Sequence, residues 1–372
     1  MSPPAGEVAH DSDDRGYDRQ GPNEPAAGSP LRRWAVRTRR SDSSGFVARR
    51  VVESALTVAA SSVMVWSLLL LTPGNPALRV LLARGVNEPV PEEIASMRAS
   101  IGLDGSPVTR FVTWAGRVVR GNFGSSWVSG RSVADELSVR LGPTALLTAF
   151  ALLFALVIAT TFAMAAAAFP NRWPDTMVRF YATIFASVPG FLVGISILQF
   201  LVVGLGWGKV IGDGSWKSAL WPALALAAPL SATWARFLRA NLLLSLAGPS
   251  VDVAFARGAS RWRILVVHAL PNAIVPFLSL AGVGVSALIG GAPIFETIFT
   301  WPGIGKYAVD AVGGRDLPVI QGFALFAVVS FVSVSLLFDV VASWLDPRLR
   351  GRSAIRRLVP ATTLIDGPGH AG

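Results

Sequence analysis

Long apolar stretches separated by short polar segments run through most of the chain. Apolar runs of about 20 residues or more, enough to cross roughly 30 Å of hydrocarbon, cover residues 51–71, 141–168, 176–205, 219–246, 273–299 and 319–344. This pattern predicts an all-α, polytopic membrane protein with six transmembrane helices. Pro189 and Gly190 lie in the middle of the third run, so that helix is expected to be broken or kinked.

The distribution of arginines predicts the orientation of these spans. Seven arginines and one acid, Asp42, lie between residues 31 and 50, directly before the first run. Such an excess marks the cytoplasmic side of a membrane helix. A signal peptide also begins with basic residues, but this run ends in Thr-Pro-Gly-Asn-Pro rather than a small-x-small cleavage site, which favours an uncleaved first helix. Six spans then place both termini in the cytoplasm.

Composition and polarity divide the chain into five regions. We expect a disordered basic cytoplasmic tail at 1–45, the first transmembrane helix at 46–72, an extracytoplasmic region of short helices at 73–140, a five-helix core at 141–345 with a cytoplasmic loop at 247–272, and a cytoplasmic tail at 346–372. In the extracytoplasmic region, Pro91 is predicted to open a short helix. In the fourth span, Arg236 and Arg239 are expected to snorkel towards the inner face.

The loop between the fourth and fifth spans is longer than a simple return to the bilayer requires. Its residues predict a short helix from Ser250 to Arg257 that ends at Gly258, followed by a second helix over residues 260–269. Val251, Ala254 and Phe255 are expected on one face of the first helix. A helix this short is marginal in water. The membrane surface, the second helix or a partner protein are three supports that the sequence leaves open.

Small residues recur on one face of the fifth span. Gly282, Ser286 and Gly290 are four residues apart, a spacing that lets two helix backbones approach closely in lipid. Packing inside one bundle, a subunit interface and a pore lining are all compatible with this pattern.

Composition argues against several classes of function. The chain has no cysteine and three histidines, which leaves little material for a metal site. The 33 basic residues gather at the ends of apolar runs, a pattern of membrane topology rather than of nucleic-acid binding. No phosphate-binding loop, nucleophile elbow or zinc-protease motif occurs. We therefore expect no catalytic, cofactor-binding or metal-binding residue, no cofactor and no enzyme activity; any energy for transport must come from another chain.

Ionisable groups are also scarce within the spans. Glu53, Glu296 and Asp339 lie at or near span ends, and the span centres carry none. This argues against an ion-coupled secondary transporter.

The loop carries a motif that resembles a known family. Asp252-Val253-Ala254, then Gly258 and Leu270-Pro271 follow the spacing of the E-A-A-x₃-G-x₉-I-x-L-P motif in permease subunits of bacterial ABC importers. Further stretches resemble its peptide/nickel branch, the dipeptide and oligopeptide permeases, in the same order along the chain: residues 72–77, 101–104, 121–126, 296–305, 315–322 and 346–350. Departures from the motif are Asp252 for Glu (or for the Arg frequent in the peptide branch), Val253 for Ala, His268 for Ile, and Ser250 for an aromatic residue.

The resemblance implies a type I importer permease fold in a bacterial cytoplasmic membrane. It implies four kinds of partner: a second homologous permease, two cytoplasmic ATP-binding subunits, an extracytoplasmic solute-binding protein and the lipid bilayer, with no nucleic acid. The substrate would be peptides or a related small solute such as a nickel chelate. The first short helix would couple the ATPases to the spans, with these residues in the coupling loop: Ser250, Val251, Asp252, Ala254, Phe255, Arg257, Gly258, Leu270 and Pro271.

Two other classes of function make different predictions. An ATP-independent carrier or channel would transport solute by itself, and a membrane-embedded enzyme would need a polar constellation within the spans. A coupling helix predicts instead that Gly258→Pro, or a charge reversal at Asp252, separates ATP hydrolysis from transport while the subunit stays in the membrane.

Overall fold

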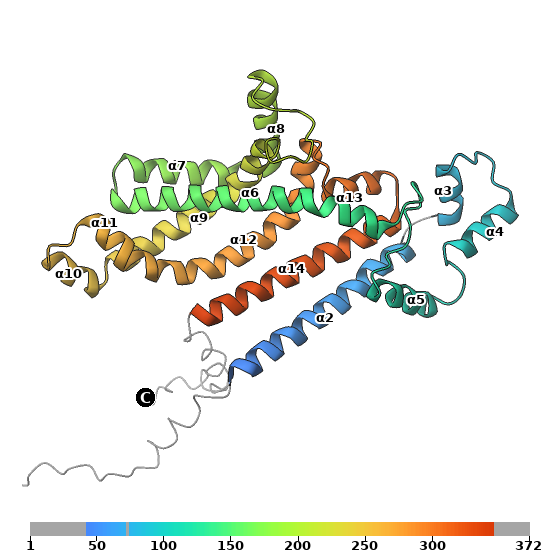
Figure 1. Ribbon diagram of the computed structural model, residues 1–372, viewed down its shortest axis with the longest axis horizontal. Helices are drawn as coiled ribbons and strands as arrows, with labels where there is room; N and C mark the ends of the chain where they lie inside the picture. The colour runs from blue at the N-terminus through green and yellow to red at the C-terminus, as the bar shows by residue number, and fades with distance from the viewer. Residues whose placement is uncertain (1–41, 72–73, 346–372) are drawn as a thin grey trace, which may run out of the picture. The chain divides into compact units, whose positions relative to one another are not determined.

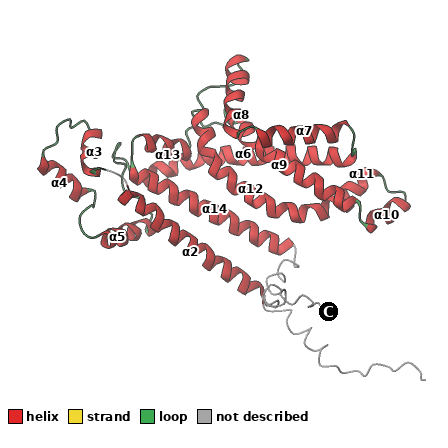
Figure 2. Cartoon of the chain, turned by 180° about the vertical axis from the view of Figure 1, so that it is seen from behind, coloured by secondary structure: helices red, strands yellow, loops and turns green. Residues whose placement is uncertain are grey.

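All regular elements in the described part of the chain are helices. The computed structural model describes residues 42–71 and 74–345, nearly all of them in the unit that begins at Phe46. Within those residues, extended pairing is limited to an isolated bridge between Ser125 and Ser132. The predicted all-α class is therefore confirmed (Figures 1 and 2). The carboxy-terminal tail and nearly all of the amino-terminal tail predicted above lie outside the described residues.

The first long helix is followed by three short ones, as predicted for this part of the chain. They are α2 (Asp42–Leu71), α3 (Pro76–Ala83), α4 (Pro91–Ser100) and α5 (Pro107–Val119). Each short helix begins with proline, whose missing N–H costs nothing in a first turn. Asn75 and Ser106 cap two of them, accepting hydrogen bonds from the N–H groups of Ala77 (3.1 Å) and Thr109 (3.2 Å).

Four long helices form the core: α6 (Val133–Ala168), α9 (Leu220–Leu246), α12 (Leu270–Ile298) and α14 (Leu317–Leu345). The closest pair is α6 with α9, which lie alongside each other in both ribbon views (Figures 1 and 2). On α6 the alanines 151, 155, 159 and 163 are fully buried at a spacing of four residues, which gives α9 a smooth surface to approach. The helix α6 begins eight residues before the predicted boundary at 141 because Ser132 caps it.

Among the residues that the structure describes, four helical stretches are long and apolar enough to cross a membrane. They are Ala48–Leu70, Val133–Ala168, Arg261–Ile298 and Leu317–Phe338, and a bent pair described below would make five. The predicted fourth span forms as α9 but falls outside this set. Its sequence includes Arg236, Arg239 and several polar or proline residues, and twelve of its residues are buried inside the bundle. A helix largely enclosed by other helices needs less lipid-facing apolar surface.

The third span is broken at Pro189, as predicted. It consists of α7 (Trp173–Ser187) and then α8 (Gly190–Ser196) with the π-helical η1 (Ile197–Gly204), and the two halves meet at 103°. Val188 is extended, with φ −93° and ψ 124°, which is the conformation that a following proline imposes.

Three short helical elements connect α9 to α12, and one follows α12. They are α10 (Pro249–Ala256), α11 (Arg261–Arg263), the π-helical η2 (Ile264–Ala269) and, after α12, α13 (Ile304–Gly313). The segment α11–η2 continues without a break into α12. The predicted second helix of the loop at 247–272 thus forms over residues 261–269 and is continuous with α12.

Candidate functional site

The short helix α10 is bounded by residues suited to its two ends. Gly248 is extended at the N-cap position and Pro249 occupies the first turn. At the other end Gly258 has φ +76°, the left-handed conformation that glycine adopts without strain. Its N–H donates to the Phe255 carbonyl (2.9 Å), and the Ala259 N–H donates to the Ala254 carbonyl (3.1 Å). These two bonds form a Schellman motif, so the predicted stop at Gly258 lies where α10 ends.

A small apolar cluster holds α10 against its own connecting segment. Val251 and Ala254 are 3% and 7% exposed and pack with Ile264 of η2, with Leu246 and Ala259 at the edge. The segment 260–269, one of the three supports considered for this helix, is thus in contact with it. Burying these side chains contributes a few kcal/mol at most.

The rest of the surface of α10 is exposed and carries both apolar and charged side chains. Phe255, predicted on the same face as Val251 and Ala254, is instead 58% exposed, and Val253 is 52% exposed. At 100° per residue, the direction between Val251 and Ala254 lies roughly 70° from Phe255, so the phenyl ring points away from the cluster. Asp252 and Arg257 are exposed on the same short helix.

The second part of the connection is rigidly joined to a core helix. Ser260 caps α11, accepting from the Arg263 N–H at 3.4 Å. The predicted motif residues Leu270 and Pro271 lie at the first turn of α12, within the continuous stretch Arg261–Ile298. Displacement of α10 would therefore reach α12 through a four-residue connector and α9 through Gly248. Ser250 is the second residue of α10.

The small residues of the fifth span lie in two environments. Gly282 is buried so closely against Phe338 of α14 that an added Cβ would lie 2.7 Å from the Phe338 Cβ. Ser286 is also buried, and its hydroxyl lies 3.4 Å from the Ser335 hydroxyl of α14. Gly290 is exposed and has open space around it. The first two positions thus allow α12 and α14 to approach each other, and the third does not take part.

A buried carboxylate joins three helices at the carboxyl end of α12. Glu296 is fully buried and accepts hydrogen bonds from the Thr144 hydroxyl of α6 (2.7 Å) and from the Lys306 N–H in the first turn of α13 (2.9 Å). The Thr144 hydroxyl in turn accepts from the Ile304 N–H at 2.9 Å. The sequence placed Glu296 near a span end but did not indicate this burial.

A second carboxylate anchors the loop between α5 and α6. Asp316, 4% exposed, directly precedes α14 and accepts from the Ser126 hydroxyl (2.5 Å), the Trp127 N–H (3.0 Å) and the Val128 N–H (3.4 Å). Because these partners are about 190 residues away, the bonds fix the loop against the start of α14. The motifs at 121–126 and 315–322 contain no local signal that predicts this contact.

An ion pair inside the bundle corrects the expectation for Arg239. Asp175 on α7 is fully buried and pairs with Arg239 on α9 and with Arg179 at 2.7 Å. The Arg239 side chain is 17% exposed, so it neutralises a buried acid rather than snorkelling to the surface. Arg236 is exposed.

The polar loop between η1 and α9 is ordered around one acid. Asp213 accepts from the Lys209 ammonium (2.7 Å) and from the Ser215 and Ser218 hydroxyls (2.6 and 2.5 Å). The Lys209 hydrogen bond first, and then the serines, hold the pKa of the Asp213 carboxyl well below its usual range.

Metal-ligating side chains form no cluster in the described part of the chain. There, no group of three or more His, Cys, Asp or Glu side chains lies close enough to hold a metal ion.

Comparison with known proteins identifies relatives along most of the chain. Residues 155–351 match the family described as "Binding-protein-dependent transport system inner membrane component". The chain is 33% identical over 305 residues to the glutathione transport system permease protein GsiC of Salmonella paratyphi A and to that of Escherichia coli (strain K12), covering 82% of this chain and 98% of each relative. A solved structure of the MetNI methionine ABC transporter is similar with a TM-score of 0.48 and 18% identity, covering 56% of this chain and 96% of that one.

Proposed function

Because the chain belongs to the family of binding-protein-dependent transport system inner membrane components, it is a permease subunit of an ABC importer, and we propose that it carries peptides of the glutathione type. The observation that supports this substrate class is the 33% identity over 98% of a permease named for glutathione transport. A nickel chelate or another small solute is the alternative within the same family.

The proposed assembly contains a second, similar permease, two cytoplasmic ATPases and an extracytoplasmic binding protein. Both termini and α10 would face the cytoplasm, and the region 73–140 would face the outside, consistent with the seven arginines before the first span. The chain would form half of the translocation pathway.

The exposed surface of α10 is the proposed contact with the ATPase. Phe255 and Val253 offer apolar surface to a partner, while Val251 and Ala254 attach the helix to the segment that continues into α12. An ATPase that moves α10 would thus tilt α12 and α9 together, a rigid-body mode of coupling.

Crosslinking can test this contact without background, because the chain has no cysteine. Phe255→Cys should crosslink to the ATPase in the assembled complex, and the yield should change when ATP closes the ATPase dimer. Trp207→Cys is the control. It is equally exposed (60% against 58%) and lies between η1 and α9, in a loop that falls outside when six spans leave both termini in the cytoplasm, so it should give no such product. Equal labelling of both positions would refute the assignment of α10.

Substrate class is tested by uptake. The complete complex in proteoliposomes, supplied with its binding protein, should import radiolabelled glutathione in an ATP-dependent manner, and excess nickel chelate should not compete. Nickel uptake without glutathione uptake would reassign the substrate.

A further inference from the structure

A cavity of about 490 Å³ lies in the region proposed to face outside. It is lined by the end of α2, the segment from α3 to α5, the loop 122–127 and the start of α14. Its size is that of a site for a small molecule. Trp66, Trp114 and Trp127 contribute aromatic wall, and the Phe111 ring bridges the first two, with ring centroids 5.5 Å from Trp66 and 6.0 Å from Trp114.

The charged residues that line this cavity are all arginines. Arg84, Arg110 and Arg117 contribute guanidinium groups, and the lining contains no Asp or Glu. In the described part of the chain none of the three pairs with a carboxylate. The Nε atom of Arg110 is buried and has no hydrogen-bond partner. A buried cationic donor without a partner is costly, and an anionic ligand would satisfy it.

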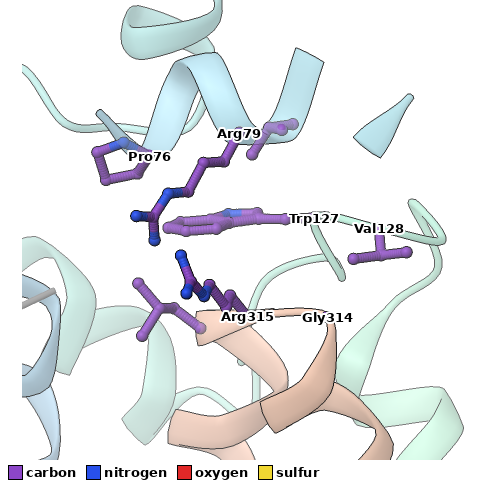
Figure 3. A pocket seen from close by; sticks show the side chains of 8 residues that line it. Pro76, Arg79, Trp127, Val128, Gly314 and Arg315 are labelled. Carbon is purple, nitrogen blue, oxygen red and sulfur yellow. The ribbon is translucent and has the colours of Figure 1, made fainter. Parts of the chain in front are cut away.

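The wall on one side is held firmly. Asp316 accepts hydrogen bonds from the Ser126 hydroxyl and the Trp127 N–H and so fixes these two lining residues. Its carboxylate oxygens are occupied by those donors. Trp127 also lines a second, small pocket, where Arg79 and Arg315 lie on either side of its indole ring (Figure 3). These two guanidinium groups add positive charge next to the cavity. Their combined charge is larger than the single negative charge of Asp316.

We propose that this cavity binds a carboxylate group of the imported peptide on the outer side of the membrane. The inference rests on the proposed function and narrows the substrate to peptides with a free carboxylate. A concave, partly open space with aromatic walls suits a small peptide rather than the convex surface of a docking protein. Guanidinium groups recognise carboxylates by charge-assisted, often bidentate hydrogen bonds. The phosphate of an anionic lipid headgroup shares this chemistry and is separated by the test.

The test measures equilibrium binding to the complete complex in phosphatidylcholine nanodiscs, without the binding protein. The probes are glutathione and its diamide, which lacks both carboxylates. Glutathione should bind, and Arg110→Gln should weaken it roughly 10- to 100-fold, the loss expected for one charge-assisted hydrogen bond. Arg110→Lys should recover part of the loss. The diamide should bind weakly to every variant.

Two further variants keep the test decisive. Arg117 is exposed, so Arg117→Gln should fold normally and still weaken glutathione binding. Arg120→Gln, three residues further on, also exposed and outside the cavity lining, should change nothing. Unchanged glutathione binding in both Arg110→Gln and Arg117→Gln would overturn the proposal.

The remaining outcomes separate the ligand sources and the two proposals. Nanodiscs with phosphatidylglycerol identify a lipid: if the arginine variants lower lipid retention but not glutathione binding, the peptide is not the ligand and the inference fails. Uptake measured on the same complex is independent of this. ATP-driven glutathione uptake without any arginine effect would refute the cavity alone, whereas arginine-dependent binding without uptake would refute the proposed function alone.

Discussion

Replacing Gly258 by proline should disconnect α10 while the rest of the bundle stays folded. Gly258 has φ +76°, and proline is restricted to a φ near −65°. Proline also lacks the N–H that Gly258 donates to Phe255. In addition, Arg257 has φ −87° and ψ 8°, a conformation disfavoured before proline.

The size of the effect follows from comparing these losses with the packing of α10. Both hydrogen bonds of the Schellman motif are lost, at about 1 kcal/mol each, before any backbone strain is added. Burial of Val251 and Ala254 contributes about 2 to 3 kcal/mol. The free energy lost with the two hydrogen bonds is thus similar to the free energy gained by packing α10. We therefore expect α10 to detach from Ile264, whereas α9 and α12 retain their own hydrogen bonds and contacts.

The chain contains a matched control for this substitution. At the end of α5, Gly121 has φ +77°, its N–H donates to the Val118 carbonyl (2.9 Å), and the Asn122 N–H donates to the Arg117 carbonyl (3.0 Å). The preceding Arg120 has φ −88° and ψ 10°. Gly121→Pro therefore imposes a closely similar local cost far along the chain from α10.

The assay is the number of ATP molecules hydrolysed per solute imported by the reconstituted complex. Gly258→Pro should raise this number at least tenfold, and Gly121→Pro should leave it within a factor of two even if uptake falls. Membrane insertion and assembly should be normal for both. Unchanged stoichiometry in Gly258→Pro, or the same rise in Gly121→Pro, would refute the reasoning.

Three other substitutions probe the polar contacts of the fold. Asp316→Asn should lower the free energy of unfolding by about 1 to 3 kcal/mol, because the Ser126 hydroxyl and two N–H groups lose a charged acceptor. It should also speed hydrogen exchange at residues 126–128. Asp310→Asn, at an exposed position, is the control, and equal exchange rates in both variants would contradict this role of Asp316. Asp175→Asn should lower the free energy of unfolding by about 3 to 5 kcal/mol, because Arg239 is left in the bundle without a charged partner. The double variant Asp175→Asn with Arg239→Met should regain part of this stability in thermal unfolding. A double variant no more stable than Asp175→Asn would argue against the ion pair. Because the pKa of Asp213 is lowered in the folded state, its contribution to folding stability is complete above about pH 4 and declines as the pH falls below that. This loss should appear as a change in Trp fluorescence when the protein is acidified, and Asp213→Asn should remove the change. A change that persists in the variant would point to another titrating group.

Local signals in the sequence were sufficient to locate most of the long helices and the points where two helices end or break. Apolar runs located α6, α12 and α14, Pro189 located the break in the third span, and Gly258 located the end of α10. Each of these features depends on neighbours within a few residues, which is why they can be read without a structure.

Contacts between distant segments were not predictable in the same way. Nothing near Arg239 in sequence indicates Asp175, which lies 64 residues away, and the partners of Asp316 are about 190 residues away. The orientation of Phe255 likewise depends on where Ile264 packs. The residues proposed for coupling can therefore be located by a motif, whereas packing decides which of them are buried and which are exposed.

The central claim is that this chain transports only as one subunit of an ATP-driven importer. Glutathione uptake into proteoliposomes should be measured with the chain alone and with the complete complex of two permeases, two ATPases and the binding protein. We predict ATP-dependent uptake by the complete complex and none by the chain alone. Uptake by the chain alone, without ATP, would contradict the account and would identify a carrier or channel.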